Sequence, residues 1–300
     1  MSQAQDLFVP GPNGRLAVRT KGLESRPEHV VLLVHASNIT GQLAFDFSFP
    51  GGADYSTMDP LVAAGFGAVT FSLSGYGLSD PPPDPLGYDT EAAIRDLDAV
   101  VAWLAAEGWQ RFHLLGWSWG GRIVGHYASR NPARVERLIL MDPALGGNAP
   151  VPPVPVAGEE WWANRTVDYL KRLEPEYTDA DGHRAFAEAV ERESPRAPNG
   201  IRVENALGKT VAVEPDALTM PVLLLYGHAA ARAPYMRGKY TRQDFFEALP
   251  AEDKQFVIVP RSSDYGHLQG TRRLFHRAIV GFLTLPFSSV IPAEAGIHSG

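Results

Sequence analysis

Short runs of apolar residues recur along this chain and are separated by segments of a different periodicity. Six runs lie at 30–34, 67–71, 112–115, 138–141, 222–226 and 256–259. Each has the length of a strand and is apolar at consecutive positions, which is typical of strands buried on both faces of a parallel sheet. Residues 89–107 instead carry apolar side chains at close to the helical period, as in Leu97, Val101 and Leu104. This alternation of strand and helix predicts a doubly wound α/β sheet.

One interval interrupts the alternation. About eighty residues separate the run ending at Met141 from the run beginning at Val222. The first part, GGNAPVPPVPVAGEE, is rich in proline and predicts an extended linker, whereas 161–173 and 183–192 have helical periodicity. We therefore expect a core formed by residues 1–145 and 216–284, a small helical cap at 146–215, a last helix at 270–283 and a flexible tail at 285–300.

Composition limits the functions that the chain can have. A net charge of -7 without a run of lysine or arginine argues against nucleic acid and anionic membranes as partners. The absence of cysteine excludes disulfides, thiolate metal sites and cysteine nucleophiles. We find no motif for a metal, nucleotide or haem, and therefore expect no cofactor. No apolar stretch has the length of a signal peptide or a membrane span, which predicts a cytoplasmic protein; oligomeric state has no signature in the sequence.

The segment HLLGWSWGGRIVGHY contains a G-x-S-x-G pattern, formed by Gly116, Ser118 and Gly120. It lies between an expected strand and an expected helix, where the chain must turn sharply. Glycines on both sides of such a turn let strand and helix approach closely, so the serine Oγ projects from the carboxyl edge of the sheet, next to the positive end of the helix dipole. A serine that only caps the helix is the alternative. The strand-turn-helix setting favours Ser118 as a nucleophile.

Several segments, in order, resemble the α/β-hydrolase superfamily. VVLLVHAS is similar to the third-strand motif that ends in His-Gly, with Ala36 in place of the glycine. FSLSGYGLSD resembles the segment after the fourth strand, with Ser72 and Ser74 in place of a charged pair, and LILMDPA, PVLLLYG and YGHL resemble the sixth strand, the seventh strand and the histidine loop. The resemblance implies an α/β-hydrolase fold with a mostly parallel eight-stranded sheet and an inserted helical cap.

The resemblance also implies a catalytic triad. His267 follows the last expected strand and corresponds to the family's general base. The usual acid after the seventh strand is missing, because YGHAAARAPYMRGKY is followed by no carboxylate before Asp244. Some members of the superfamily place the acid after the sixth strand, where this chain has Asp142, 24 residues beyond Ser118. We expect Asp142 to accept a hydrogen bond from the histidine Nδ1, with Asp264 as the alternative acid.

The remaining site residues follow from the same resemblance. The N–H groups of Trp119 and Ser37 are expected to form the oxyanion hole, and His35 is expected to brace the turn that carries Ser37. Aromatic residues near the mouth of the site predict an apolar acyl or aryl pocket. The predicted pocket residues are Phe45, Trp117, Trp161 and Trp162.

These features predict a serine hydrolase that cleaves a carboxylic ester or lactone through an acyl-enzyme intermediate. Its substrate is expected to be small and neutral or apolar. An acyltransferase would use the same residues, and a ligand receptor built on a hydrolase fold would carry a degenerate triad. Both alternatives remain open at the level of the sequence, as does the choice between Asp142 and Asp264.

Overall fold

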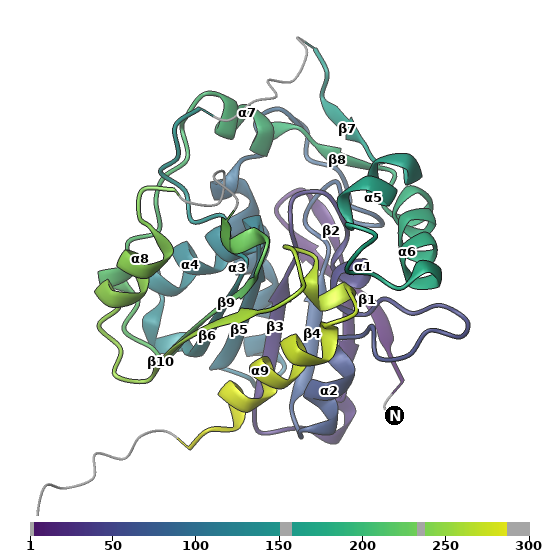
Figure 1. The fold of residues 1–300 in the computed structure, drawn as a ribbon. Coiled ribbons are helices and arrows are strands. Elements are labelled where there is room, and N and C mark those ends of the chain that lie inside the picture. Colours follow the sequence, from purple (N-terminus) through teal and green to yellow (C-terminus); the bar gives the residue numbers. More distant parts are fainter. Residues whose placement is uncertain (1–2, 151–157, 233–237, 287–300) are drawn as a thin grey trace, which may run out of the picture.

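The computed structural model describes residues 3–150, 158–232 and 238–286. Within these ranges the centre of the molecule is an eight-stranded sheet (Figure 1). Its strands, in order across the sheet, are β1 (Gln5–Gly11), β2 (Gly14–Lys21), β4 (Gly67–Phe71), β3 (Val30–Val34), β5 (Phe112–Trp117), β6 (Val135–Met141), β9 (Val222–Gly227) and β10 (Lys254–Val259). The strands from β4 to β10 are parallel, and β1 and β2 are antiparallel. The expected doubly wound, mostly parallel sheet is confirmed.

Each of the six apolar runs forms a parallel strand of this sheet. The hairpin of β1 and β2 was not predicted, because β1 is mostly exposed, β2 begins with two exposed residues, and neither strand is apolar along its whole length. Antiparallel strands at the edge of a sheet can leave one face in water. A search for fully buried strands therefore misses them.

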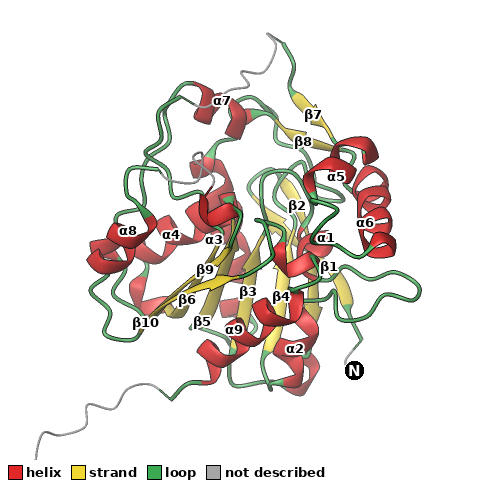
Figure 2. Ribbon diagram, in the orientation of Figure 1, coloured by secondary structure: helices red, strands yellow, loops and turns green. Residues whose placement is uncertain are grey.

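Helices cover both faces of the sheet (Figure 2). One face carries α3 (Thr90–Ala106), α4 (Trp119–Arg130) and α8 (Arg242–Ala248), and the other carries α1 (Gly41–Phe45), α2 (Met58–Ala63) and α9 (Arg272–Thr284). Successive residues of a strand point to opposite faces, so β5 contributes Leu114 to one core and Leu115 to the other. These two apolar layers fix the strand ends on which the site is built.

The segment between β6 and β9 forms a separate group of elements beyond the carboxyl edge of the sheet. It contains α5 (Thr166–Arg172), α6 (Ala180–Glu193), α7 (Gly200–Ala206) and a two-stranded antiparallel sheet of β7 (Trp161–Ala163) and β8 (Arg196–Pro198). The prediction of a helix over 161–173 was therefore wrong for residues 161–163, which form β7. In the extended strand the indoles of Trp161 and Trp162 pack against different guanidinium groups, those of Arg196 and Arg202, each 4.1 Å from the ring centroid.

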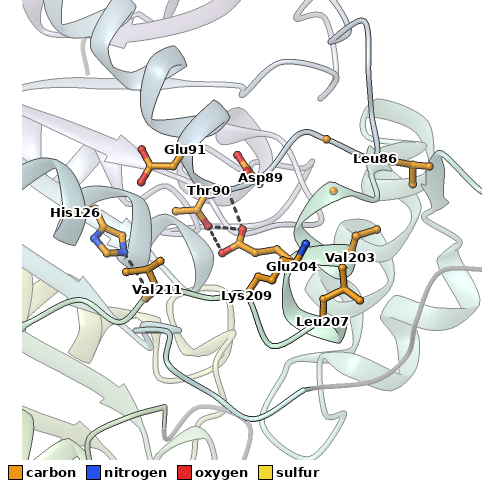
Figure 3. Close-up of a pocket in the computed structure, with 12 residues that line it drawn as sticks. Leu86, Asp89, Thr90, Glu91, His126, Val203, Glu204, Leu207, Lys209 and Val211 are labelled. Carbon is orange, nitrogen blue, oxygen red and sulfur yellow. Dashed lines mark hydrogen bonds between the residues drawn. The ribbon is translucent and has the colours of Figure 1, made fainter.

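A buried ion pair joins this inserted segment to the core. Nη1 of Arg122 on α4 lies 3.1 Å from Oε1 of Glu204 on α7. The same carboxylate accepts hydrogen bonds from the backbone N–H and the hydroxyl of Thr90 at the start of α3. Figure 3 shows Glu204 directed at Thr90 beside a cavity of about 310 Å³ that also contains His126. The Glu204 carboxylate thus holds α7 of the inserted segment to both α3 and α4 of the core.

Two sequence predictions concern residues outside the described ranges. They are the extended linker, of which residues 151–157 are not described, and the flexible tail, of which residues 287–300 are not described. Of the helices in the described ranges, none has both the length and the apolar character needed to cross a bilayer.

Candidate active site

Ser118 lies at the junction between β5 and α4, as the sequence predicted. Its backbone has φ 54° and ψ -113°, a conformation that residues with a Cβ rarely adopt. The surrounding backbone holds it there, because its N–H donates to the Met141 carbonyl at 3.0 Å and its carbonyl accepts from the Ala144 N–H at 2.9 Å. This is the strained turn that the fold uses to present a nucleophile.

The two glycines of the pattern are required by close backbone contacts. A Cβ added to Gly120 would lie 2.1 Å from the Val34 carbonyl oxygen, and one added to Gly116 would lie 2.3 Å from the Gly120 carbonyl oxygen. Both distances are far below van der Waals contact. The turn can therefore form at this strand only with glycine at both positions.

Ser118 faces a cavity of about 250 Å³. Ser37, Trp117 and Trp119 line the same cavity, so the two predicted oxyanion-hole residues and one predicted pocket residue lie beside the serine. Phe45 is fully buried in the core, and neither it nor Trp161 nor Trp162 lines this cavity. The structure thus brings together only part of the predicted pocket.

The lining is more polar than the expected apolar pocket. Polar and charged side chains contribute much of the wall, and only Asp264 among them was predicted from the sequence. They are Asn38, Arg122, Asn148, Arg172, Asn205 and Asp264. Arg122 stands one helical turn after Ser118, a spacing that signals a shared helix face, whereas Arg172 comes from the inserted segment and had no such signal.

His35 braces the turn that carries Ser37. Its Nδ1–H donates to the Ala36 carbonyl oxygen at 2.7 Å, and its Nε2 accepts the Leu73 N–H at 3.0 Å. Complete burial lowers the pKa of His35 to about 4, which keeps the ring in this neutral form. The hydroxyl of Tyr76 donates to the Ser37 carbonyl oxygen at 2.8 Å, so the turn is fixed from two sides.

His267 lies in a short 3₁₀ helix, Gly266–Leu268, and is fully buried. Its Nε2 donates to the Ala44 carbonyl oxygen at 3.1 Å, and its Nδ1 has no hydrogen-bond partner. Burial lowers the pKa of the ring to about 3. Among the described residues no hydrogen bond joins His267 to Ser118 or Asp142, and His267 does not line the cavity.

Asp142 follows β6, as predicted, and is fully buried. Its Oδ1 accepts the Gly227 N–H at 2.9 Å, whereas Oδ2 has no hydrogen-bond partner. Burial raises the pKa of this carboxyl well above its usual range, and repulsion from Asp264 adds to the rise. In this arrangement the protonated form of the Asp142 carboxyl is favoured more than it is in water.

Asp264 is the carboxyl group that lines the cavity together with Ser118. Its backbone carbonyl accepts a hydrogen bond of 2.7 Å from Nε1 of Trp117. Desolvation raises the pKa of its side chain to about 6, and the negative charge of Glu174 contributes. Asp264 is therefore mostly ionised at neutral pH and can accept a proton.

Comparison with known proteins identifies a matching family model and proteins of similar sequence. The α/β-hydrolase-fold family model matches residues 48–227. A 2-hydroxy-6-oxononadienedioate/2-hydroxy-6-oxononatrienedioate hydrolase of Paraburkholderia xenovorans (strain LB400) is 32% identical over 134 residues, which are 42% of this chain and 45% of the relative. The chain thus spans less than half of that relative's length. The AB hydrolase superfamily protein YisY of Bacillus subtilis (strain 168) is 27% identical over 222 residues, 70% of this chain and 78% of the relative.

Solved structures show the same fold at low sequence identity. The enol-lactonase from Burkholderia xenovorans LB400 superposes with a TM-score of 0.68 at 16% identity, over 93% of this chain and 100% of that one. A bromoperoxidase from Bacillus anthracis gives a TM-score of 0.67 at 15% identity, over 93% and 99%. Since the family match covers more than half of the sequence, this chain belongs to the α/β-hydrolase family.

Proposed function

We propose that this protein hydrolyses a carboxylic ester or lactone, with Ser118 as the nucleophile. The observation that carries the proposal is the strained backbone of Ser118 at the edge of a cavity that also contains Ser37 and Trp119. The names of two relatives, an enol-lactonase and a dioate hydrolase, agree with hydrolytic chemistry on small oxygenated compounds.

In the proposed reaction the Ser118 Oγ attacks the substrate carbonyl carbon and loses its proton to a general base. The N–H groups of Trp119 and Ser37 bind the oxyanion that forms. The intermediate then collapses to an acyl-enzyme, and the base returns its proton to the departing alcohol or enolate oxygen. Water repeats these steps to release the acid.

We propose that His267 is the base and Asp142 its acid in an assembled state of the site. That state requires His267 to leave the Ala44 carbonyl and to move past Trp117, against which its ring packs. The unpartnered Nδ1 of His267 and Oδ2 of Asp142 support the rearrangement. Each buried atom without a hydrogen bond costs about 1–3 kcal/mol, so pairing the two would remove both costs.

Asp264 is the alternative base, and its position favours it. It lines the Ser118 cavity without any rearrangement, and the pKa of its side chain, about 6, leaves it ionised at pH 7. A carboxylate in this cavity would have to come within hydrogen-bond distance of the Ser118 hydroxyl to take its proton, because no hydrogen bond joins Asp264 and Ser118 in the described structure. A carboxylate is a weaker base than a neutral imidazole, so it would remove the Ser118 proton less effectively near pH 7.

The cavity lining supports a substrate with polar or anionic groups rather than the apolar one expected from the sequence. Arg172 lines the cavity, and its guanidinium group interacts with Tyr265 and Tyr169 but has no carboxylate within 4.0 Å in the described part of the chain. The relative from P. xenovorans is named for dioate substrates, which are dicarboxylates. We propose that a carboxylate on the substrate would lie near Arg172.

A ligand receptor without turnover is the second candidate function. The side chain of His267 is hydrogen-bonded to the Ala44 carbonyl and not to Ser118 in the described structure. A serine without a base is a poor nucleophile, so this arrangement favours a receptor. An acyltransferase uses the proposed chemistry but releases the acyl group to an acceptor other than water. The three functions are distinguished by whether Ser118 becomes acylated and by which molecule then accepts the acyl group.

The test combines a fluorophosphonate probe with turnover of p-nitrophenyl esters of short, long and carboxylate-bearing acyl chains. We expect an adduct on Ser118 in the wild type and loss of both adduct and turnover in Ser118→Ala. Ser129→Ala, on the same helix, is the matched control and should retain both. An adduct without ester turnover would indicate a receptor or acyltransferase. Unchanged turnover in Ser118→Ala would exclude Ser118 as the nucleophile.

A further inference from the structure

Two histidines and a glutamate lie close together at the amino ends of the strands, whereas Ser118 follows the carboxyl end of β5. His29 directly precedes β3, His113 is the second residue of β5, and Glu136 is the second residue of β6. These strands are neighbours in the sheet and run parallel, so their amino ends lie side by side (Figure 1). At about 3.3 Å per residue, His113 is roughly 16 Å from Ser118 along β5. The cluster is therefore separate from the candidate active site.

Each of the three side chains offers one potential ligand atom to the cluster. Oε2 of Glu136 lies 2.9 Å from Nδ1 of His29 and 3.4 Å from Nε2 of His113. The three ligand atoms all lie within 4.8 Å of one another. In a tetrahedral zinc site with bonds of about 2.0 Å, ligand atoms are about 3.3 Å apart. Small side-chain shifts would bring the cluster to this geometry.

Burial makes the cluster a built site rather than a chance meeting of surface groups. The side chains of His113 and Glu136 are only 3% and 11% exposed, whereas that of His29 is 38% exposed. The ring of Phe66 packs against both imidazoles, with centroid distances of 6.5 Å to His29 and 5.6 Å to His113. Two ligands are thus held by the core while one side of the site stays open to solvent.

The two imidazoles converge on one carboxylate oxygen of Glu136. Nδ1 of His113 is buried and has no hydrogen-bond partner in the described structure. The carboxylate of Glu28 is close by, with Oε1 3.7 Å from Nε2 of His29, and adds negative charge at the open side. A cation bound by Nδ1 of His29, Nε2 of His113 and Oε2 of Glu136 would replace these contacts with coordination bonds; Nδ1 of His113 is the other nitrogen of that ring and would not be a ligand.

We propose that His29, His113 and Glu136 bind one divalent transition-metal ion of the zinc class, with water completing the coordination shell. Two imidazoles and one carboxylate are ligands that this class prefers, whereas calcium and magnesium prefer oxygen alone. The ion would tie together the amino ends of β3, β5 and β6 and so stabilise the sheet. Sequence patterns do not reveal the cluster, since its ligands are 84 and 23 positions apart and form no motif.

The test uses the full chain, purified without a histidine tag and freed of metal with a chelator. Zinc binding is measured by calorimetry and by metal content after dialysis, and thermal unfolding is followed with and without zinc. We expect one zinc ion per chain with micromolar or tighter affinity, and a Tm that rises with zinc concentration because the ion binds only the folded state. Cobalt should bind in place of zinc and give the visible absorption of a low-coordinate site.

Two variants and one control locate the ion. His29→Ala and Glu136→Gln should each weaken zinc binding at least tenfold and remove the effect of zinc on Tm; His29 is partly exposed, so its variant is expected to fold. His228→Ala changes a histidine at the opposite edge of the sheet and should bind zinc as the wild type does. Absence of binding by the wild type at 100-fold excess zinc, or equal binding by all variants, would overturn the proposal. The cluster would then be a hydrogen-bonded group only.

Discussion

The imidazole of His267 packs edge-on against the indole of Trp117, with ring centroids 4.5 Å apart and an interplanar angle of 73°. The same indole donates its Nε1–H to the backbone carbonyl of Asp264 at 2.7 Å. Trp117 therefore contacts both residues that are candidates for the general base. His267 is buried in the core in contact with the indole, and Asp264 lines the cavity of Ser118.

Substitution of each candidate base distinguishes the two. With His267 as the base, His267→Asn should lower kcat by about 10³–10⁴-fold, the usual loss when a triad member is removed. Asp264→Asn should then lower kcat by less than about tenfold. The opposite order would make Asp264 the base. In that case activity would rise with pH through about 6, as the Asp264 carboxyl ionises, and Asp264→Asn would abolish this pH dependence.

Asp142→Asn tests the proposed acid. The amide oxygen can still accept the Gly227 N–H, but it cannot stabilise an imidazolium, so kcat should fall by about 10⁴-fold. The Tm should stay the same or rise. A carboxyl with a raised pKa in the folded state ionises more readily when the chain unfolds, which favours unfolding at pH 7, and the amide removes this effect.

Asp216→Asn, at an exposed position, is the control for Asp142→Asn and should change neither kcat nor Tm. A Tm that drops by more than about 5 °C in Asp142→Asn would show a structural role. Loss of activity could not then be assigned to loss of the acid.

The sequence predicted those parts of the fold and site that depend on local pattern. Buried strands are visible as apolar runs, and the turn at Ser118 is visible because Gly116 and Gly120 are needed by backbone contacts. The state of His267 is not local. Its Nε2 is hydrogen-bonded to the carbonyl of Ala44, 223 positions away, and its ring packs against Trp117. No sequence motif indicates either of these two contacts. For the same reason Arg172 and the His29 cluster were found only in three dimensions.

Gly120→Ala should prevent the turn at Ser118 from forming. The new Cβ would lie 2.1 Å from the Val34 carbonyl oxygen and 2.7 Å from that of His35, and neither backbone atom can move without separating β3 from β5. We expect a loss of stability of at least about 3 kcal/mol in urea unfolding, or failure to fold.

Gly281→Ala is the matched control, because a Cβ at this position on α9 has no neighbour within 4 Å. It should stabilise the helix slightly, by about 0.5–1 kcal/mol. Equal effects of the two variants would contradict the steric explanation for the glycine pattern.

Removal of Glu204 should separate the inserted segment from the core. Glu204→Ala leaves Arg122, which is 2% exposed, without its ion-pair partner and removes the acceptor for the Thr90 N–H. Breaking a buried pair by removing one partner costs about 3–5 kcal/mol. Glu91→Ala breaks the exposed pair with Arg130 and should cost less than about 1 kcal/mol, as measured by urea unfolding. Similar losses of unfolding free energy in both variants would show that Glu204 does not hold the inserted segment to the core.

His276 should lower the free energy of unfolding of the protein in mild acid. It is buried on α9, with its Nε2 3.3 Å from the hydroxyl of Thr57, and burial lowers the pKa of its ring to about 4. Between pH 6.5 and 4 the unfolded chain therefore binds a proton at this residue that the folded protein does not. The free energy of unfolding should fall as the pH decreases, by up to about 1.4 kcal/mol per pH unit for each such histidine.

The measurement is urea unfolding of the wild type and His276→Asn at several pH values from 4.5 to 8. The variant should show a smaller decrease of stability below pH 6.5 than the wild type. Between pH 7 and 8 the two slopes should be equal, because neither the folded nor the unfolded state binds the proton there, and this range serves as the control. Since asparagine can keep the contact with Thr57 but cannot titrate, equal slopes below pH 6 would mean that His276 takes up its proton without unfolding.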